Sequence, residues 1–220
     1  MCGRYTLATD LAEYLSRFRL ELPDELQHPR LYNIAPSQPV LGMVATPECR
    51  LDIMEWGFVP GWAKEEGKFP SVINARGETV SEKPYFRGAF RSNRCAILAD
   101  GFYEWKREGD EKRPYRITLK DGGVFAMAGL RSERITNDGS LRISCAIITT
   151  RPNRLMADIH DRMPVILPTD HVENWLDREA PSRELKAMIA SYPAEQMEAV
   201  EVSTLVNNPR NDSPECIVPV

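Results

Sequence analysis

Between residues 40 and 167 the chain is a succession of short apolar segments, each bounded by turn-forming or charged residues. The segments expected to be strands are VLGMVA, LDIMEWGFV, RCAILADGFYEW, PYRITL, GVFAMAGL, LRISCAIITT and PVIL. The regular strand–helix alternation of a parallel sheet is missing from this region. The sequence therefore predicts an α+β fold, built on antiparallel, barrel-like sheets with peripheral helices.

The segments between and around these strands indicate turns and helices. KREGDEKR, with Gly109, and SERITNDGS, with an Asn-Asp-Gly turn, are typical of hairpin connections. TDLAEYLSRFRL has apolar residues at helical spacing behind Asp10 as a cap, and further helices are expected from Asp170 and from Ser182. The proline-rich stretch ELPDELQHPRLYNIAPSQPV is expected to be mostly extended loop, and AVEVSTLV a last strand.

The length of 220 residues suits one large domain, and no repeat or low-complexity linker divides the chain. We therefore expect a single domain over residues 1–220. No run reaches the roughly 18 apolar residues of a membrane-spanning helix. The N-terminus lacks the pattern of a signal peptide. The expectation is a cytoplasmic protein with no membrane association.

Cysteine and histidine usage indicates neither a disulfide framework nor a metal site. The five cysteines are unevenly spaced without a CxxC pair, and the three histidines form no ligand grouping with them. Cys95 and Cys145 lie within apolar runs, where a buried thiol is expected. No metal and no cofactor are predicted.

Among the five cysteines, Cys2 has a position that a chemical role would explain. Removal of Met1 would leave an α-amine, with a pKa of about 7.7–8.0, and a thiol, with a pKa of about 8.5, on one residue. The alternative is an inert thiol near a frayed chain end.

The stretch SVINARGET places Asn74 and Arg76 two residues apart, so both side chains lie on one face if the backbone is extended. An amide beside a guanidinium suits an oxyanion or phosphate clamp. The alternative is a loop in which the asparagine caps a turn and the arginine is solvated.

The stretch ADGFYEW places Glu104 between aromatic residues of a predicted strand. A carboxylate on an apolar face has a raised pKa and suits general acid–base chemistry. The alternative is an edge-strand glutamate paired with an arginine.

The stretch DIHDRMPVIL places His160 among three charged residues before an apolar strand. Histidine titrates near neutrality and moves protons, although a lone histidine is more often structural.

The net charge of −4 argues against a general coating of nucleic acid. Residues 76–94 nevertheless form a modest basic stripe, which reads either as a solvated face or as a phosphate track.

Taken together, the motifs MCGRY, YNIAPSQ, WGFVPGW, INARGET, ADGFYEW and IHDRMP, in this order, closely resemble the SRAP family, the SOS response-associated peptidase domain of abasic-site processing proteins. The resemblance runs from residue 2 to at least Pro164, and a VSTLVNN segment also fits. It implies a single SRAP domain whose partner is single-stranded DNA containing abasic sites.

The resemblance implies covalent capture of the abasic sugar. The amine of Cys2 would form a Schiff base with the C1′ aldehyde, and the sulfur would close a thiazolidine ring on the same carbon. This shields the site during the DNA damage response. An internal cysteine has no amine, so Met1 has to be removed, by an autopeptidase activity or by an aminopeptidase.

By the same resemblance, Glu104 transfers protons to and from Cys2 and the sugar, His160 is a second acid or base, and Asn74 orients the cysteine or its adduct. Arg4, Arg76 and Arg162 are the phosphate-binding candidates. Trp62 either stacks on a base or packs in the core. A monomer, associated with the nucleoid when it acts on DNA, is expected.

Two other functions are also compatible with the sequence. Class II glutamine amidotransferases also begin with Met-Cys-Gly and use an N-terminal cysteine as nucleophile. The second alternative is a non-catalytic module that binds single-stranded DNA and in which Cys2 has no chemical role.

Overall fold

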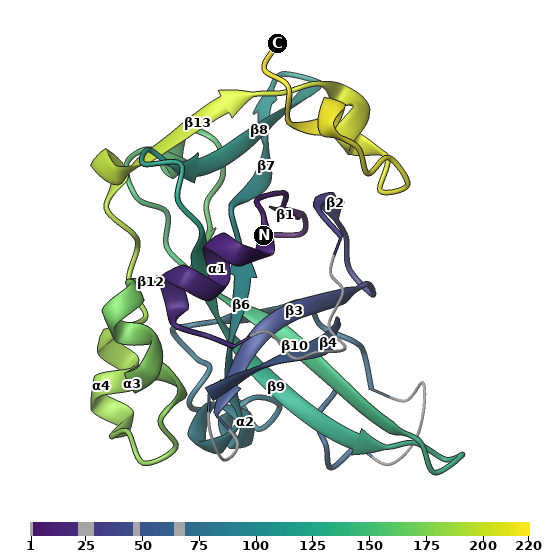
Figure 1. Cartoon of the computed structure of the whole chain (residues 1–220), viewed down its shortest axis with the longest axis vertical. Helices are drawn as coiled ribbons and strands as arrows, with labels where there is room; N and C mark the ends of the chain where they lie inside the picture. Colours follow the sequence, from purple (N-terminus) through teal and green to yellow (C-terminus); the bar gives the residue numbers. More distant parts are fainter. Residues whose placement is uncertain (1, 22–28, 46–48, 64–68) are drawn as a thin grey trace.

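A computed structural model describes residues 2–21, 29–45, 49–63 and 69–220 of the chain. Within these residues two sheets carry the fold (Figure 1). The first has five strands in the order β13-β8-β7-β1-β2. Its members are β1 (Tyr5–Leu7), β2 (Leu31–Ile34), β7 (Gly101–Glu108), β8 (Glu111–Leu119) and β13 (Met197–Glu201).

The second sheet has eight strands and follows the order β11-β10-β4-β3-β6-β9-β12, with β5 added to β10. Its members are β3 (Pro39–Ala45), β4 (Cys49–Trp56), β5 (Asn74–Arg76), β6 (Arg94–Ala99), β9 (Phe125–Ile135), β10 (Leu141–Thr150), β11 (Met163–Pro164) and β12 (Ile166–Leu167). Strand β9 also pairs with β10, which gives a barrel-like arrangement. Most pairings are antiparallel, as predicted, but β10 runs parallel to β4 and β5.

The helices are short and lie at the periphery, which confirms the predicted α+β class (Figure 1). They are α1 (Leu11–Phe18), α2 (Arg87–Ser92), α3 (Val172–Leu176) and α4 (Ser182–Ala187), with the 3-10 turns η1 (Met156–Asp158), η2 (Thr169–His171), η3 (Ala194–Gln196), η4 (Thr204–Asn207) and η5 (Pro214–Ile217). The carboxylate of Asp10 accepts a hydrogen bond from the Ala12 amide and caps α1 as expected. None of the described helices is long and apolar enough to cross a membrane.

Both predicted hairpins form. Glu108 lies opposite Glu111 around Gly109, and Ile135 lies opposite Leu141 around the Asn-Asp-Gly turn. Gly109 and Gly139 have φ values of 64° and 83°, a backbone region that favours glycine.

Three predictions about secondary structure are wrong. RCAILADGFYEW is two strands rather than one, because the chain leaves the larger sheet at Asp100 and enters the smaller one as β7. PVIL is divided between β11 and β12, which pair with different neighbours. The predicted last strand AVEVSTLV ends at Glu201 as β13, and Thr204–Asn207 form η4 instead. The proline-rich stretch, expected to be mostly extended loop, contains the short strand β2, which pairs with β1; residues 22–28 of that stretch lie outside the described residues.

The core fills the space between the sheets. Cys95 and Cys145 are fully buried in it, as predicted. A second, smaller cluster formed by Tyr103, Val202, Val206 and Cys216 lies beneath the C-terminal segment. This segment is therefore packed against β7 and brings η4 close to the middle of that strand.

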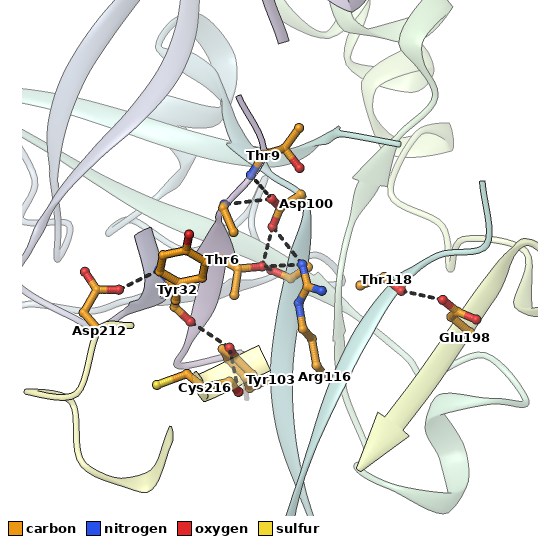
Figure 2. A network of polar contacts seen from close by, with 12 residues as sticks. Thr6, Thr9, Tyr32, Asp100, Tyr103, Arg116, Thr118, Glu198, Asp212 and Cys216 are labelled. Atoms are coloured by element: carbon orange, nitrogen blue, oxygen red, sulfur yellow. Dashed lines mark hydrogen bonds and ion pairs between the residues drawn. The ribbon is translucent and has the colours of Figure 1, made fainter. Parts of the chain in front are cut away.

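Strand β1 is fixed by a buried carboxylate, Asp100, at the turn between β6 and β7 (Figure 2). Its oxygens accept hydrogen bonds from the Thr6 hydroxyl at 2.5 Å, from the Ala8 and Thr9 amides at 2.7 and 2.6 Å, and from Arg116 Nη2 at 3.2 Å. A buried polar group must be satisfied in this way, and here its partners fix β1 against β7. The N-terminal residues are positioned as a result.

Candidate active site

Pairing of β1 with β7 brings Cys2 next to Glu104. Tyr5 lies opposite Phe102, and the Tyr103 amide donates a 2.9 Å hydrogen bond to the Arg4 carbonyl, so the antiparallel register continues beyond β1. Cys2 is fully buried. Burial raises the pKa of its thiol, and the charge of Glu104 raises it further. Such a thiol is a poor nucleophile until a nearby base takes its proton.

Asn74 holds the backbone of Cys2. Its Nδ2 atom donates a 2.8 Å hydrogen bond to the Cys2 carbonyl. The Asn74 Oδ1 atom is buried and has no hydrogen-bond partner among the described residues. Parallel pairing of Asn74 with Ile147 of β10 fixes the strand that carries it. The site therefore has a free acceptor beside the N-terminal cysteine.

Glu104 is 3% exposed in its side chain. Burial raises its pKa from the ordinary value of 4.5 to about 7. A carboxyl group that titrates near neutrality exchanges protons in either direction at physiological pH. Burial and a raised pKa agree with the predicted properties of this carboxylate, and its catalytic role stays a prediction.

His160 follows η1 and faces Glu104. The distance from His160 Nε2 to Glu104 Oε2 is 3.9 Å, which is longer than a hydrogen bond. The Nδ1 atom accepts a 3.0 Å hydrogen bond from the Arg162 amide and is also 3.0 Å from Asp161 Oδ1. Burial lowers the pKa of His160 and favours the neutral form of the ring. A substrate oxygen lying alongside Glu104 and His160 would connect them.

Glu104 and His160 open into a cleft of about 340 Å³ that Trp105, Arg107, Lys112 and Asn207 also line. Sequence reasoning did not single out these four residues. Asn207 comes from η4, and its Oδ1 accepts a 2.7 Å hydrogen bond from Trp105 Nε1. It belongs to the VSTLVNN segment of the family resemblance, and Arg107 and Lys112 follow from the hairpin register.

The predicted phosphate-binding arginines differ in their surroundings. Arg76 is exposed on β5, two residues from Asn74. Arg162 forms a two-pronged ion pair with Glu78, at 2.6 and 2.9 Å, and also donates to the Thr149 carbonyl. Arg4 donates to Asn33 Oδ1 and to the Val206 carbonyl, both at 2.8 Å, and lies over the ring of Trp105. Among the three, Arg76 is exposed, whereas Arg4 and Arg162 are half-buried.

Trp62 lies apart from this cleft. Its side chain is 55% exposed, so it is not a core residue. It makes edge-to-face contacts with Phe69 and Tyr85, and lines a separate cleft of about 530 Å³. Among the described residues, none lines both clefts. Stacking of Trp62 on a base stays a prediction.

Comparison with known proteins gives the class of this chain. Residues 1–209 match the family model described as SOS response associated peptidase (SRAP). The chain belongs to the SRAP family, which confirms the resemblance drawn from its motifs.

Its relatives are named for abasic sites. The abasic site processing protein YoqW of Bacillus subtilis is 46% identical over 222 residues, with 99% of each chain covered. YedK of Escherichia coli, which carries the same description, is 33% identical over 227 residues and all of both chains. HMCES of Xenopus tropicalis, likewise so described, is 36% identical over 196 residues, or 77% of this chain and 57% of that protein.

Solved structures share the fold. A protein from Bacteroides thetaiotaomicron superposes with a TM-score of 0.87 at 24% identity over the whole of both chains. A protein from Bordetella bronchiseptica gives a TM-score of 0.79 at 26% identity, over 92% of this chain and 100% of the other.

Proposed function

We propose that this protein senses abasic sites in single-stranded DNA and captures them covalently through Cys2 once Met1 has been removed. The observation that carries the proposal is the convergence on Cys2 of an amide donor from Asn74 and a buried acid–base group, Glu104. The names of the relatives support abasic sites as the substrate class.

The chemistry uses both functional groups of the N-terminal cysteine. The free amine of Cys2 attacks the C1′ aldehyde of the ring-opened sugar, and loss of one water gives a Schiff base. The thiol sulfur then adds to the imine carbon while its proton passes to the nitrogen, which closes a thiazolidine. The ring removes the imine from hydrolysis and from β-elimination, so the product protects the strand.

Glu104 is the first candidate for proton transfer in both steps. Its carboxyl group, with a pKa of about 7, can pass a proton from the attacking amine to the sugar oxygen that leaves as water, and can then pass the thiol proton of Cys2 to the imine nitrogen. The raised pKa of the thiol makes such a base necessary.

His160 is the second acid–base group of the proposal. Its Nε2 atom is 3.9 Å from Glu104 Oε2, so a sugar oxygen lying alongside the two groups would contact both. In the family resemblance this histidine acts in reversal of the crosslink. We assign it proton delivery to the ring during release.

Binding of the strand is assigned to the arginines that the motifs indicate. Arg76 is exposed beside Asn74 and is the first phosphate contact in the proposal. Arg162 would bind phosphate only in competition with Glu78. Arg4 acts through its contacts with Asn33 and Val206 on the position of the N-terminal strand. Trp62 would contact a base farther from the captured sugar.

The remaining parts of the proposal concern processing and place of action. Met1 is removed either by the protein itself, as the family description implies, or by an aminopeptidase. The protein acts as a monomer in the cytoplasm, on the nucleoid, during the DNA damage (SOS) response.

Intact-mass spectrometry of the purified protein with and without an abasic oligonucleotide tests the proposal. The expected wild-type mass lacks Met1, and DNA adds the mass of one oligonucleotide less one water. Cys2→Ala should bind DNA and give no heat-stable adduct. A heat-stable adduct with Cys2→Ala would contradict the mechanism. Glutamine hydrolysis by the trimmed protein would favour the amidotransferase reading, and DNA binding without any adduct would favour a binding module.

A further inference from the structure

Two cations at the rim of the candidate site face each other across the β7–β8 hairpin. Arg107 lies directly opposite Lys112 in the antiparallel register. Side chains in such positions have Cβ atoms about 4.5–5.5 Å apart, and like charges there are destabilising. In the part of the chain that the structure describes, neither cation has a carboxylate within ion-pair distance.

The neighbouring pair on the same hairpin is neutralised. Lys106 lies opposite Arg113. The Lys106 ammonium is 2.9 Å from Glu108, and Arg113 is 3.6 Å from Glu108 and 3.9 Å from Glu201. One cation pair of this hairpin therefore has anionic partners within the protein, and the next pair has none.

The unneutralised pair belongs to the cleft of the candidate site. Arg107 and Lys112 line it together with Glu104, His160 and Asn207. Burial is the largest cause of the lowered pKa of His160, and the charge of Arg107 makes a smaller contribution in the same direction. Arg107 therefore lies within electrostatic range of the His160 ring. An anion bound by the pair would lie at the mouth of the cleft.

We propose that Arg107 and Lys112 bind adjacent backbone phosphates of the DNA strand on one side of the abasic sugar. This rests on the proposed function and adds a phosphate site outside the motifs that define the family resemblance. Neutralisation by phosphate offsets the repulsion between the two cations. The local pair also reconciles DNA binding with a net charge of −4.

Salt dependence of binding gives the first test. A labelled single-stranded oligonucleotide with a tetrahydrofuran site, which has no aldehyde, reports non-covalent affinity by fluorescence anisotropy. The double variant Arg107→Ala, Lys112→Ala should reduce the slope of log K against log salt by about 1.4, because each single-strand phosphate contact contributes about 0.7. The matched control, Lys106→Ala with Arg113→Ala, removes the same charge from the same hairpin and should leave the slope unchanged.

Neutralising single phosphates as methylphosphonates identifies the contacts. The wild type should lose affinity at one or two positions on the same side of the abasic site, and the Arg107→Ala, Lys112→Ala protein should be indifferent there. Its unfolding temperature should equal or exceed that of the wild type, since a repulsive pair is removed. An unchanged slope, an equal loss in the control, or equal methylphosphonate effects in variant and wild type would overturn the proposal.

Adduct formation with an aldehyde-bearing oligonucleotide is scored separately. The double variant should need a higher DNA concentration than the wild type for the same yield. Absence of the wild-type adduct contradicts the proposed function, whereas an unchanged salt slope in a wild type that does form the adduct contradicts the hairpin site alone.

Discussion

Two buried carboxylates lie four residues apart in the stretch ADGFYEW, and they have opposite surroundings. Asp100 accepts hydrogen bonds from one hydroxyl, two backbone amides and one guanidinium (Figure 2). Glu104 lies beside the Cys2 thiol and 3.9 Å from the His160 ring, and burial raises its pKa to about 7. The two side chains are both 3% exposed.

The difference shows how one strand supports both structure and chemistry. Fixed donors favour the charged form of a carboxylate and hold neighbouring backbone in place. A carboxyl group that is desolvated next to proton-exchanging groups is suited to move protons. Burial is equal in the two cases, so the surrounding groups decide the role. Asp100 positions β1, and Glu104 acts on the cysteine that β1 carries.

The largest expected effect comes from Glu104→Gln. Loss of the general acid–base group should reduce the rate of adduct formation by about 10²–10⁴-fold, with the fold intact. Quenched-flow or gel-based time courses at saturating DNA measure it. Glu108→Gln, on the same face of β7 but exposed, is the matched control and should keep the wild-type rate. Equal rates for Glu104→Gln and the wild type would remove Glu104 from the chemistry.

Asp100→Ala should act on stability. It removes the acceptor of the Ala8 and Thr9 amides, one of the two acceptors of the Thr6 hydroxyl and the ion-pair partner of Arg116, and should lower the free energy of unfolding by about 3 kcal/mol. Urea denaturation measures the change. Glu82→Ala, at an exposed carboxylate, should stay within about 0.5 kcal/mol of the wild type. A small effect of Asp100→Ala would mean that the network does not hold β1.

The pH dependence of stability tests the raised pKa of Glu104. The folded-state pKa of Glu104, about 7, lies above its ordinary value of 4.5. The stabilisation that protonated Glu104 adds to the free energy of unfolding is complete below pH 4.5 and is lost as pH rises through about 7. This is a change of about 3 kcal/mol. Denaturation midpoints across this window should fall with pH in the wild type and fall less in Glu104→Gln. Identical profiles would contradict a raised pKa at Glu104.

The smallest effect concerns the ion pair of Arg162 with Glu78. Glu78→Gln removes the competing carboxylate and should tighten DNA binding about two- to three-fold, the equivalent of about 0.5 kcal/mol for a partly exposed pair. Glu82→Gln controls for the change in net charge. Weaker binding by Glu78→Gln would indicate that Glu78 holds Arg162 in its binding geometry.

The sequence alone predicted the parts of the fold that local pattern controls. Helix α1, the two hairpins and most long strands carry periodic apolar residues and glycine turns. The break at Asp100 was missed because the apolar run continues across it, although Asp-Gly is a turn signal. Strands β1 and β2 are short and pair over long sequence distances, so periodicity could not reveal them.

The same limit applies to the site. Motifs brought out Cys2, Asn74, Glu104 and His160, and the structure brings these residues together. Local charge was a poorer guide. Arg94 of the predicted basic stripe is buried, and donates to the backbone carbonyls of Phe90, Arg91, Trp175 and Asp177. The cation pair in the cleft belongs to a hairpin that composition marked as a turn.

The central claim is that the amine and the sulfur of Cys2 both react with the abasic sugar, and Cys2→Ser tests it most directly. Serine keeps the amine and lacks the thiol. With an abasic oligonucleotide, the wild type should give a heat-stable adduct without reductant, and Cys2→Ser should give one only when borohydride traps the Schiff base. Intact-mass spectrometry reads out both. A heat-stable, unreduced adduct of Cys2→Ser in wild-type yield would contradict ring closure through sulfur.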